Sequence, residues 1–136
     1  MGRPVSYAPD LVATARVAFG HGALASPTHT ARADNPRCGD DIELDVADDG
    51  AQVRAVAHRT RGCTFTLASA SILAQTVPTM SVAAARALAF ELRRDLAGTA
   101  PLPQSVAMLA GVRIYPARVR CALLPWEALL RALAEV

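Results

Sequence analysis

The fold is decided by the stretch Ile42-Glu43-Leu44-Asp45-Val46-Ala47-Asp48-Asp49-Gly50 and the residues that follow it. Its three large apolar side chains alternate with Glu, Asp and Ala, which is the pattern of a strand with one buried face. The Asp-Asp-Gly sequence at its end is typical of a hairpin turn, so we predict a returning strand over residues 51–58. Because a single hairpin is only marginally stable in water, a third strand or covering helices must complete the structure.

The flanking segments supply those elements. Before the hairpin we predict a helix over residues 10–19, a loop over 20–30 and an edge strand over 28–33. After it we predict helices over residues 66–77, 81–97, 102–110 and 126–134, with Ser81 as a cap, Gly98 and Gly111 as stops, and Pro125 near the first turn of the last helix. Strands followed by helices indicate one α+β domain over residues 1–136, with helices packed on one face of a small antiparallel sheet.

Composition excludes several classes of function. The chain has 136 residues, of which 52% are hydrophobic, so it can bury a core and is not disordered. Its 14 basic residues are scattered among 12 acidic ones and give a net charge of +2, which argues against a nucleic-acid partner. No run of 18 apolar residues exists, which argues against a membrane partner.

Three cysteines stand far apart, in the segments Asn35-Pro36-Arg37-Cys38-Gly39-Asp40, Arg61-Gly62-Cys63-Thr64 and Arg118-Val119-Arg120-Cys121-Ala122. An odd number of cysteines cannot be paired completely within one chain. In a reducing cytosol, where we expect this protein to act, they stay thiols, and metal binding or sulfur chemistry is then favoured over disulfides.

Each cysteine precedes a predicted strand or helix, and such boundary loops can meet at one end of a domain. Cys38, Cys63 and Cys121 with the carboxylate of Asp40 would make a four-ligand tetrahedral set, as zinc prefers. Nearby arginines and predicted helix N-termini favour the thiolate form. The alternative is that a cysteine is simply a small buried apolar residue, as the following Ala122-Leu123-Leu124 suggests for Cys121. His21, His29 and His58 are further candidate ligands, although a lone histidine is more often solvated.

Taken together, these segments resemble the IscU/NifU-type iron–sulfur cluster assembly proteins. The matching pieces are Asn35 to Asp40, Gly62-Cys63 followed by Ala68-Ser69-Ala70-Ser71, and Arg118 to Trp126. Arg120 stands where IscU-like members have a histidine, and residues 114–118 replace their Leu-Pro-Pro-Val-Lys motif, which favours the SufU-like branch. The resemblance implies an α+β fold with a three-stranded sheet.

The resemblance also implies a function. A SufU-like protein would hold zinc through Cys38, Asp40, Cys63 and Cys121 and would accept persulfide sulfur from a SufS-like cysteine desulfurase. It would then be a sulfur-transfer partner of that desulfurase rather than a stand-alone enzyme. Cys38 is the favoured acceptor of the sulfur. Cys121 remains the alternative acceptor, because the third cysteine is the usual candidate in IscU-like relatives. The alternatives are a scaffold that assembles a [2Fe-2S] cluster on the same ligands and a non-catalytic, zinc-stabilised interaction domain.

Overall fold

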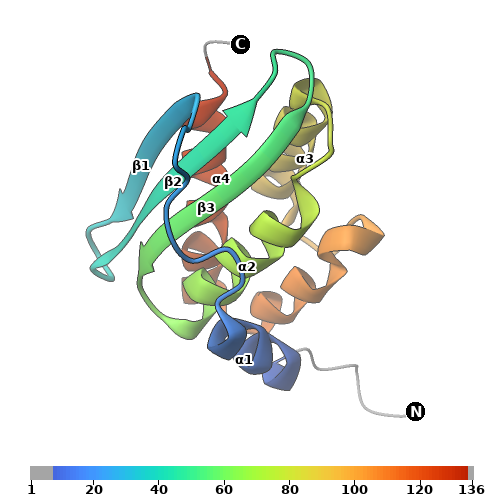
Figure 1. Ribbon diagram of the computed structural model, residues 1–136. Coiled ribbons are helices and arrows are strands. Elements are labelled where there is room, and N and C mark those ends of the chain that lie inside the picture. The colour runs from blue at the N-terminus through green and yellow to red at the C-terminus, as the bar shows by residue number, and fades with distance from the viewer. Residues whose placement is uncertain (1–7, 135–136) are drawn as a thin grey trace.

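The computed structural model describes residues 8–134 of the chain (Figure 1). Within this range the elements are, in order, α1 (Ala8–Val17), β1 (His29–Asn35), β2 (Asp40–Asp48), β3 (Val53–Arg61), α2 (Thr64–Thr76), α3 (Val82–Asp95), the 3-10 segments η1 (Gln104–Ile114) and η2 (Pro116–Arg118), and α4 (Val119–Ala132). None of the helices in the described range is long and apolar enough to cross a membrane.

The strands form one antiparallel sheet in the order β1-β2-β3. Ile42, Leu44 and Val46 of β2 are fully buried on the side that faces the helices, which confirms the strand predicted from their alternation. The returning strand was predicted two residues too early, because the turn extends to Gln52 and the pairing slips by one residue beside Ala47. The predicted edge strand is present as β1.

The helices lie on one side of this sheet, as Figure 1 shows. Helices α2 and α4 pack directly on the strands, α3 packs on α4, and α1 packs on α2. The predicted α+β class with a three-stranded sheet is therefore confirmed. A polar joint fixes α2 against α4 inside the core: the Trp126 indole donates to the Ser69 hydroxyl at 3.0 Å, and that hydroxyl donates to the carbonyl of Ala122.

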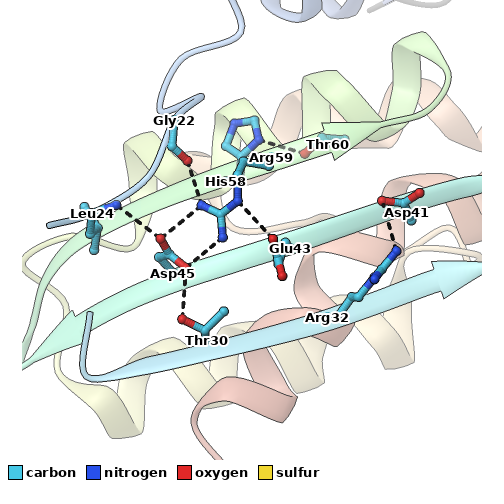
Figure 2. A network of polar contacts seen from close by, with 10 residues as sticks. All are labelled: Gly22, Leu24, Thr30, Arg32, Asp41, Glu43, Asp45, His58, Arg59 and Thr60. Atoms are coloured by element: carbon cyan, nitrogen blue, oxygen red, sulfur yellow. Dashed lines mark hydrogen bonds and ion pairs between the residues drawn. The ribbon is translucent and has the colours of Figure 1, made fainter. Parts of the chain in front are cut away.

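The opposite face of the sheet carries a charged network and the segment that connects α1 to β1 (Figure 2). Arg59 donates two hydrogen bonds of 3.0 Å to Asp45, one of 3.0 Å to Glu43 and one of 2.9 Å to the carbonyl of Gly22. Asp45 also accepts from the amide of Leu24 at 3.1 Å. These bonds hold the connecting segment across the face of the sheet.

Two helix predictions were wrong. The last helix begins at Val119 rather than near Pro125, so Pro125 lies inside it and Cys121 sits in its first turn. At this position the proline removes the helical hydrogen bond to the carbonyl of Cys121, and the packing of α4 in the core must offset that loss. The short helix predicted over residues 102–110 is a 3-10 segment that runs through Gly111 to Ile114.

The cap prediction was correct. The hydroxyl of Ser81 accepts a hydrogen bond from the amide of Ala84 at 3.0 Å, as an N-cap residue should. Helix α3 ends at Asp95, shortly before the predicted stop at Gly98. Helix α1 is displaced by two residues toward the N-terminus from its predicted range.

Candidate metal centre

Three segments distant in sequence meet at one end of the sheet. The turn between β1 and β2 carries Cys38, the junction between β3 and α2 carries Cys63, and the first turn of α4 carries Cys121. The strand register sets this arrangement, because Asp41 pairs with Arg61 and so places the start of β2 beside the residues that lead into α2. The turn at Cys38 is closed by the carbonyl of Asn35, which accepts the amides of Cys38 at 3.1 Å and Gly39 at 2.9 Å.

Three of the four predicted ligands form a compact group. Ligand atoms of Cys38, Asp40 and Cys121 all lie within 4.8 Å of one another. The two sulfur atoms are 3.8 Å apart. Two thiolates at about 2.3 Å from a tetrahedral zinc ion would stand about 3.8 Å apart, so this pair has the spacing that such an ion requires. The soft sulfur donors and one carboxylate also suit zinc chemically.

The accessibility of the two paired cysteines differs sharply. Cys38 is exposed on its turn, whereas Cys121 is fully buried. Burial raises the pKa of the Cys121 thiol well above its usual range, and hydrogen bonding with Asp40 and Cys63 raises it further. Of this pair, only Cys38 is a residue that solvent reaches.

Cys63 lies beside the compact group rather than within it. It is the N-cap residue of α2, and its Sγ is 3.5 Å from the hydroxyl of Thr66. Hydrogen bonding with Cys63 and its charge contribute to the raised pKa of Cys121.

Asp40 is buried and held by neighbours that the sequence argument did not identify. One of its carboxylate oxygens accepts from the hydroxyl of Thr66 at 2.7 Å, and the other accepts from the amide of Cys63 at 3.3 Å. Gly62 leaves the room for this arrangement, since a Cβ there would stand 2.9 Å from the Asp40 Cγ and 3.1 Å from the Thr66 Cβ. Thr66 could have been identified from the sequence, because it follows Cys63 by three residues and so lies on the first turn of α2 beside it.

The rim of the site is cationic. Arg37, Arg61 and Arg120, which stand next to the cysteines in sequence, are all exposed. A fourth cation, Arg118, was missed as a partner of the thiols: its pKa is raised, first by a hydrogen bond to Cys121 and then by the charge of Cys63. Its spacing of three residues from Cys121, around the start of α4, could have suggested it.

The histidines lie away from the cysteines in the described part of the chain. His58 is fully buried between Thr60, at 2.7 Å, and the carbonyl of Phe19, at 2.9 Å. His21 stacks edge-on against it, with ring centroids 5.6 Å apart. His29 pairs with Asp48 at 2.8 Å. Among residues 8–134, none of the three histidines belongs to the compact group of Cys38, Asp40 and Cys121.

Comparison with known proteins gives consistent results. The family described as the NifU-like N terminal domain matches residues 20–135. The zinc-dependent sulfurtransferase SufU of Bacillus subtilis is 31% identical over 106 residues, which cover 74% of this chain and 71% of that protein. The iron–sulfur cluster assembly scaffold protein IscU of Streptococcus pyogenes is 33% identical over 117 residues, which cover 83% of this chain and 73% of that protein.

A solved structure agrees with the sequence relatives. The crystal structure of a nitrogen-fixing NifU-like protein (N-terminal) from Brucella abortus superposes with a TM-score of 0.82 at 25% identity and covers 95% of this chain and 92% of its own. The fold is thus matched by a solved structure, and the family by sequence. The chain belongs to the NifU-like N-terminal domain family, which includes the SufU and IscU proteins of iron–sulfur cluster assembly.

Proposed function

We propose that this protein accepts persulfide sulfur from a cysteine desulfurase at Cys38 and holds zinc through Cys38, Asp40, Cys63 and Cys121. The observation that carries the proposal is the pairing of an exposed thiol with a buried one, 3.8 Å apart and beside a buried carboxylate. A relative named as a zinc-dependent sulfurtransferase supports the choice of metal and of reaction.

The proposed reaction is a thiol exchange at one sulfur atom. The Cys38 thiolate attacks the terminal sulfur of the desulfurase persulfide, the S–S bond to the desulfurase cysteine breaks, and that cysteine leaves as a thiolate. Cys38 then carries the persulfide, and no outside oxidant or reductant is consumed. Bound zinc would keep the thiols deprotonated at neutral pH and so provide the nucleophile.

The surrounding residues serve this exchange in three ways. The exposed guanidinium groups of Arg37, Arg61 and Arg118 offset the negative charge of three thiolates and a carboxylate. Thr66 and the amide of Cys63 hold the Asp40 carboxylate in place when Cys38 engages the persulfide. The buried Cys121 thiol stays out of reach of a partner, which is the reason that we assign the acceptor role to Cys38.

The test measures sulfide release by a SufS-like cysteine desulfurase in the presence of a reductant. The wild-type chain should raise the rate severalfold and should carry about one zinc per chain, with a persulfide on Cys38 by mass spectrometry. Cys38→Ala should abolish the stimulation, whereas His29→Ala should leave both zinc and stimulation unchanged. Zinc without stimulation would instead favour a zinc-stabilised interaction domain.

The second candidate is a scaffold for a [2Fe-2S] cluster, which the IscU relative favours because the same thiols and carboxylate could ligate iron. Anaerobic purification that yields iron and sulfide, rather than zinc, would support it. In both cases we expect residues 1–136 to act as a single SufU/IscU-like domain in the cytoplasm, where thiols stay reduced.

A further inference from the structure

A cavity of about 340 Å³ opens where the turn after β1 meets α3 and α4. One wall is a single face of α4, made by residues that recur three and four positions apart: Arg120, Leu123, Leu124 and Glu127. Pro36, in the turn after β1, and Arg93, in the last turn of α3, also line it. No residue of the compact ligand group lines the cavity, so it is distinct from the candidate metal centre.

One positive charge in this cavity is left without a partner. Arg93 and Glu127 bond to each other at 2.7 and 3.2 Å and so neutralise one another. Asp34 stands at the edge of the cavity, but its pairing with Asp41 turns its side chain to the open face of the sheet. Arg120 makes no hydrogen bond or ion pair with any residue in the range 8–134. The cavity therefore attracts a single anionic group, and it does so at Arg120.

The surface beside this charge is apolar. Leu124 is buried, Leu123 is half-buried, and Pro36 stands across from them. A carboxylate can take two parallel hydrogen bonds from the guanidinium of Arg120, and an apolar group attached to it would cover the two leucines. A phosphate would leave that apolar surface uncovered. A free amino acid would bring an ammonium group for which no unpaired carboxylate lines the cavity.

The size and the walls of the cavity select among apolar carboxylates. Sites for small molecules measure about 300 to 1,000 Å³ and bury roughly 70–90% of their ligand. This cavity is at the small end of that range, and three of its walls, at Pro36, Arg93 and Arg120, are exposed. It can hold one residue-sized group while the rest of the ligand continues into solvent, which describes the end of a polypeptide chain.

We propose that the cavity binds the carboxyl-terminal residue of a partner polypeptide that ends in an apolar side chain. The terminal carboxylate bonds to Arg120, and the side chain packs on Leu123 and Leu124. This site does not depend on the acceptor role of Cys38. A polypeptide bound there would nevertheless lie next to the candidate metal centre, because Arg120 directly precedes Cys121 in the chain.

The probe that tests binding is a fluorescent pentapeptide of glycine and serine that ends in leucine with a free carboxylate, titrated against the full-length chain as purified. Fluorescence anisotropy should show saturable binding, and NMR should place the shifted amides at Arg120 and Leu123. The same peptide with an amidated end should bind at least tenfold more weakly, because Arg120 loses its anionic partner. A peptide that ends in serine should bind at least fivefold more weakly, because it covers less of the apolar surface.

Variants of the chain test the contact at Arg120. Arg120→Gln should raise the Kd of the leucine peptide at least tenfold, whereas Arg120→Lys keeps the charge without the paired hydrogen bonds and should raise it only two- to fivefold. The matched control is Arg37→Gln, which removes an equally exposed arginine that does not line the cavity and should leave the Kd within twofold. Circular dichroism checks that all three variants are folded.

Several outcomes would overturn the proposal. Equal binding of the free and the amidated peptide, or no saturable binding at millimolar concentrations, would show that no chain end is recognised. Equal losses in Arg37→Gln and Arg120→Gln would reduce the contact to general positive charge. Displacement of the peptide by an equal concentration of inorganic phosphate would make Arg120 a simple anion site. If 4-methylpentanoate binds as tightly as the leucine peptide, the ligand is a small organic acid and the polypeptide assignment is wrong.

Discussion

The open face of the sheet and its cysteine-bearing end differ in whether their charged side chains are paired. On the open face, Arg59 bonds to two carboxylates and a carbonyl, and Asp45 accepts from Arg59, Thr30 and the amide of Leu24 (Figure 2). At the other site the side chains of Arg37, Arg61 and Arg120 have no bonded partner among residues 8–134, and a fully buried thiol has a raised pKa.

The difference separates a structural network from a site that awaits a ligand. Satisfied charges lower the free energy of the folded chain and fix the connecting segment on the sheet. The unpaired arginines around the cysteines indicate a binding site. Their positive charge is offset only when the thiols bind a metal as thiolates or when a negatively charged partner binds. Changes in the first region should therefore alter stability, and changes in the second should alter binding.

The largest effect is expected from Cys121→Ser. A serine hydroxyl does not ionise at neutral pH, so zinc affinity should fall at least about 100-fold, while the metal-free chain keeps most of its stability. Competition with a chromophoric chelator measures the affinity. Asp45→Asn is the control from the other region and should leave zinc affinity within about twofold. Unchanged affinity in Cys121→Ser would make Cys121 an ordinary core residue.

Next in size is Asp45→Asn as a stability change. The change removes the negative charge of the carboxylate that accepts hydrogen bonds from Arg59. The free energy of unfolding should therefore fall by about 2 kcal/mol, equally with and without zinc. Hydrogen bonding to Arg59 lowers the pKa of Asp45, so this stabilisation is full above its ordinary pKa of 3.8 and is lost as the pH falls below that value. Urea denaturation measures it.

The matched control for that change is Asp34→Asn, which removes an exposed carboxylate that has no bonded partner among the described residues. Its effect on the free energy of unfolding should stay below about 0.5 kcal/mol. Similar losses in both variants would mean that the bonds of the open face contribute nothing beyond general surface charge.

A smaller change should lower both stability and zinc affinity. Gly62→Ala forces a Cβ against the Asp40 carboxylate, so stability should fall by about 1 kcal/mol and zinc affinity by about tenfold. Gly98→Ala is the control, since its Cβ would make only ordinary contact at 3.4 Å with a backbone oxygen. Thermal denaturation and chelator competition report the two effects. If zinc affinity survived Gly62→Ala, the position of Asp40 would not matter for binding.

The smallest effect concerns His58 and pH. Burial lowers the pKa of His58, and the charges of His21 and Arg59 lower it further against the hydrogen bond to the Phe19 carbonyl. Its contribution to stability is therefore full above about pH 6.5 and declines as the pH falls below that value. His58→Gln should flatten the stability profile between pH 7 and pH 5, as measured by urea denaturation. An unchanged profile would assign the acid sensitivity to other groups.

Much of the fold was available from local pattern. The alternation at Ile42, Leu44 and Val46 predicts a strand because side chains alternate between two faces, and Ser81 predicts a cap because its hydroxyl satisfies a free amide. The order of the cysteine segments was enough to indicate the family. Each of these signals lies within a few residues of the chain or is a sequence motif, so it can be recognised without a structure.

The geometry of the site was decided by tertiary structure. Pro125 predicts a late helix start, but packing of α4 on the sheet extends the helix back to Val119 and places Cys121 in its buried first turn. Thr66 meets Asp40 only because the strand register and the helix packing bring separate segments together. The sequence by itself determined which residues carry the chemistry. The three-dimensional packing decided which thiol is buried, which is exposed and what surrounds them, because burial and distance between remote segments depend on the whole fold.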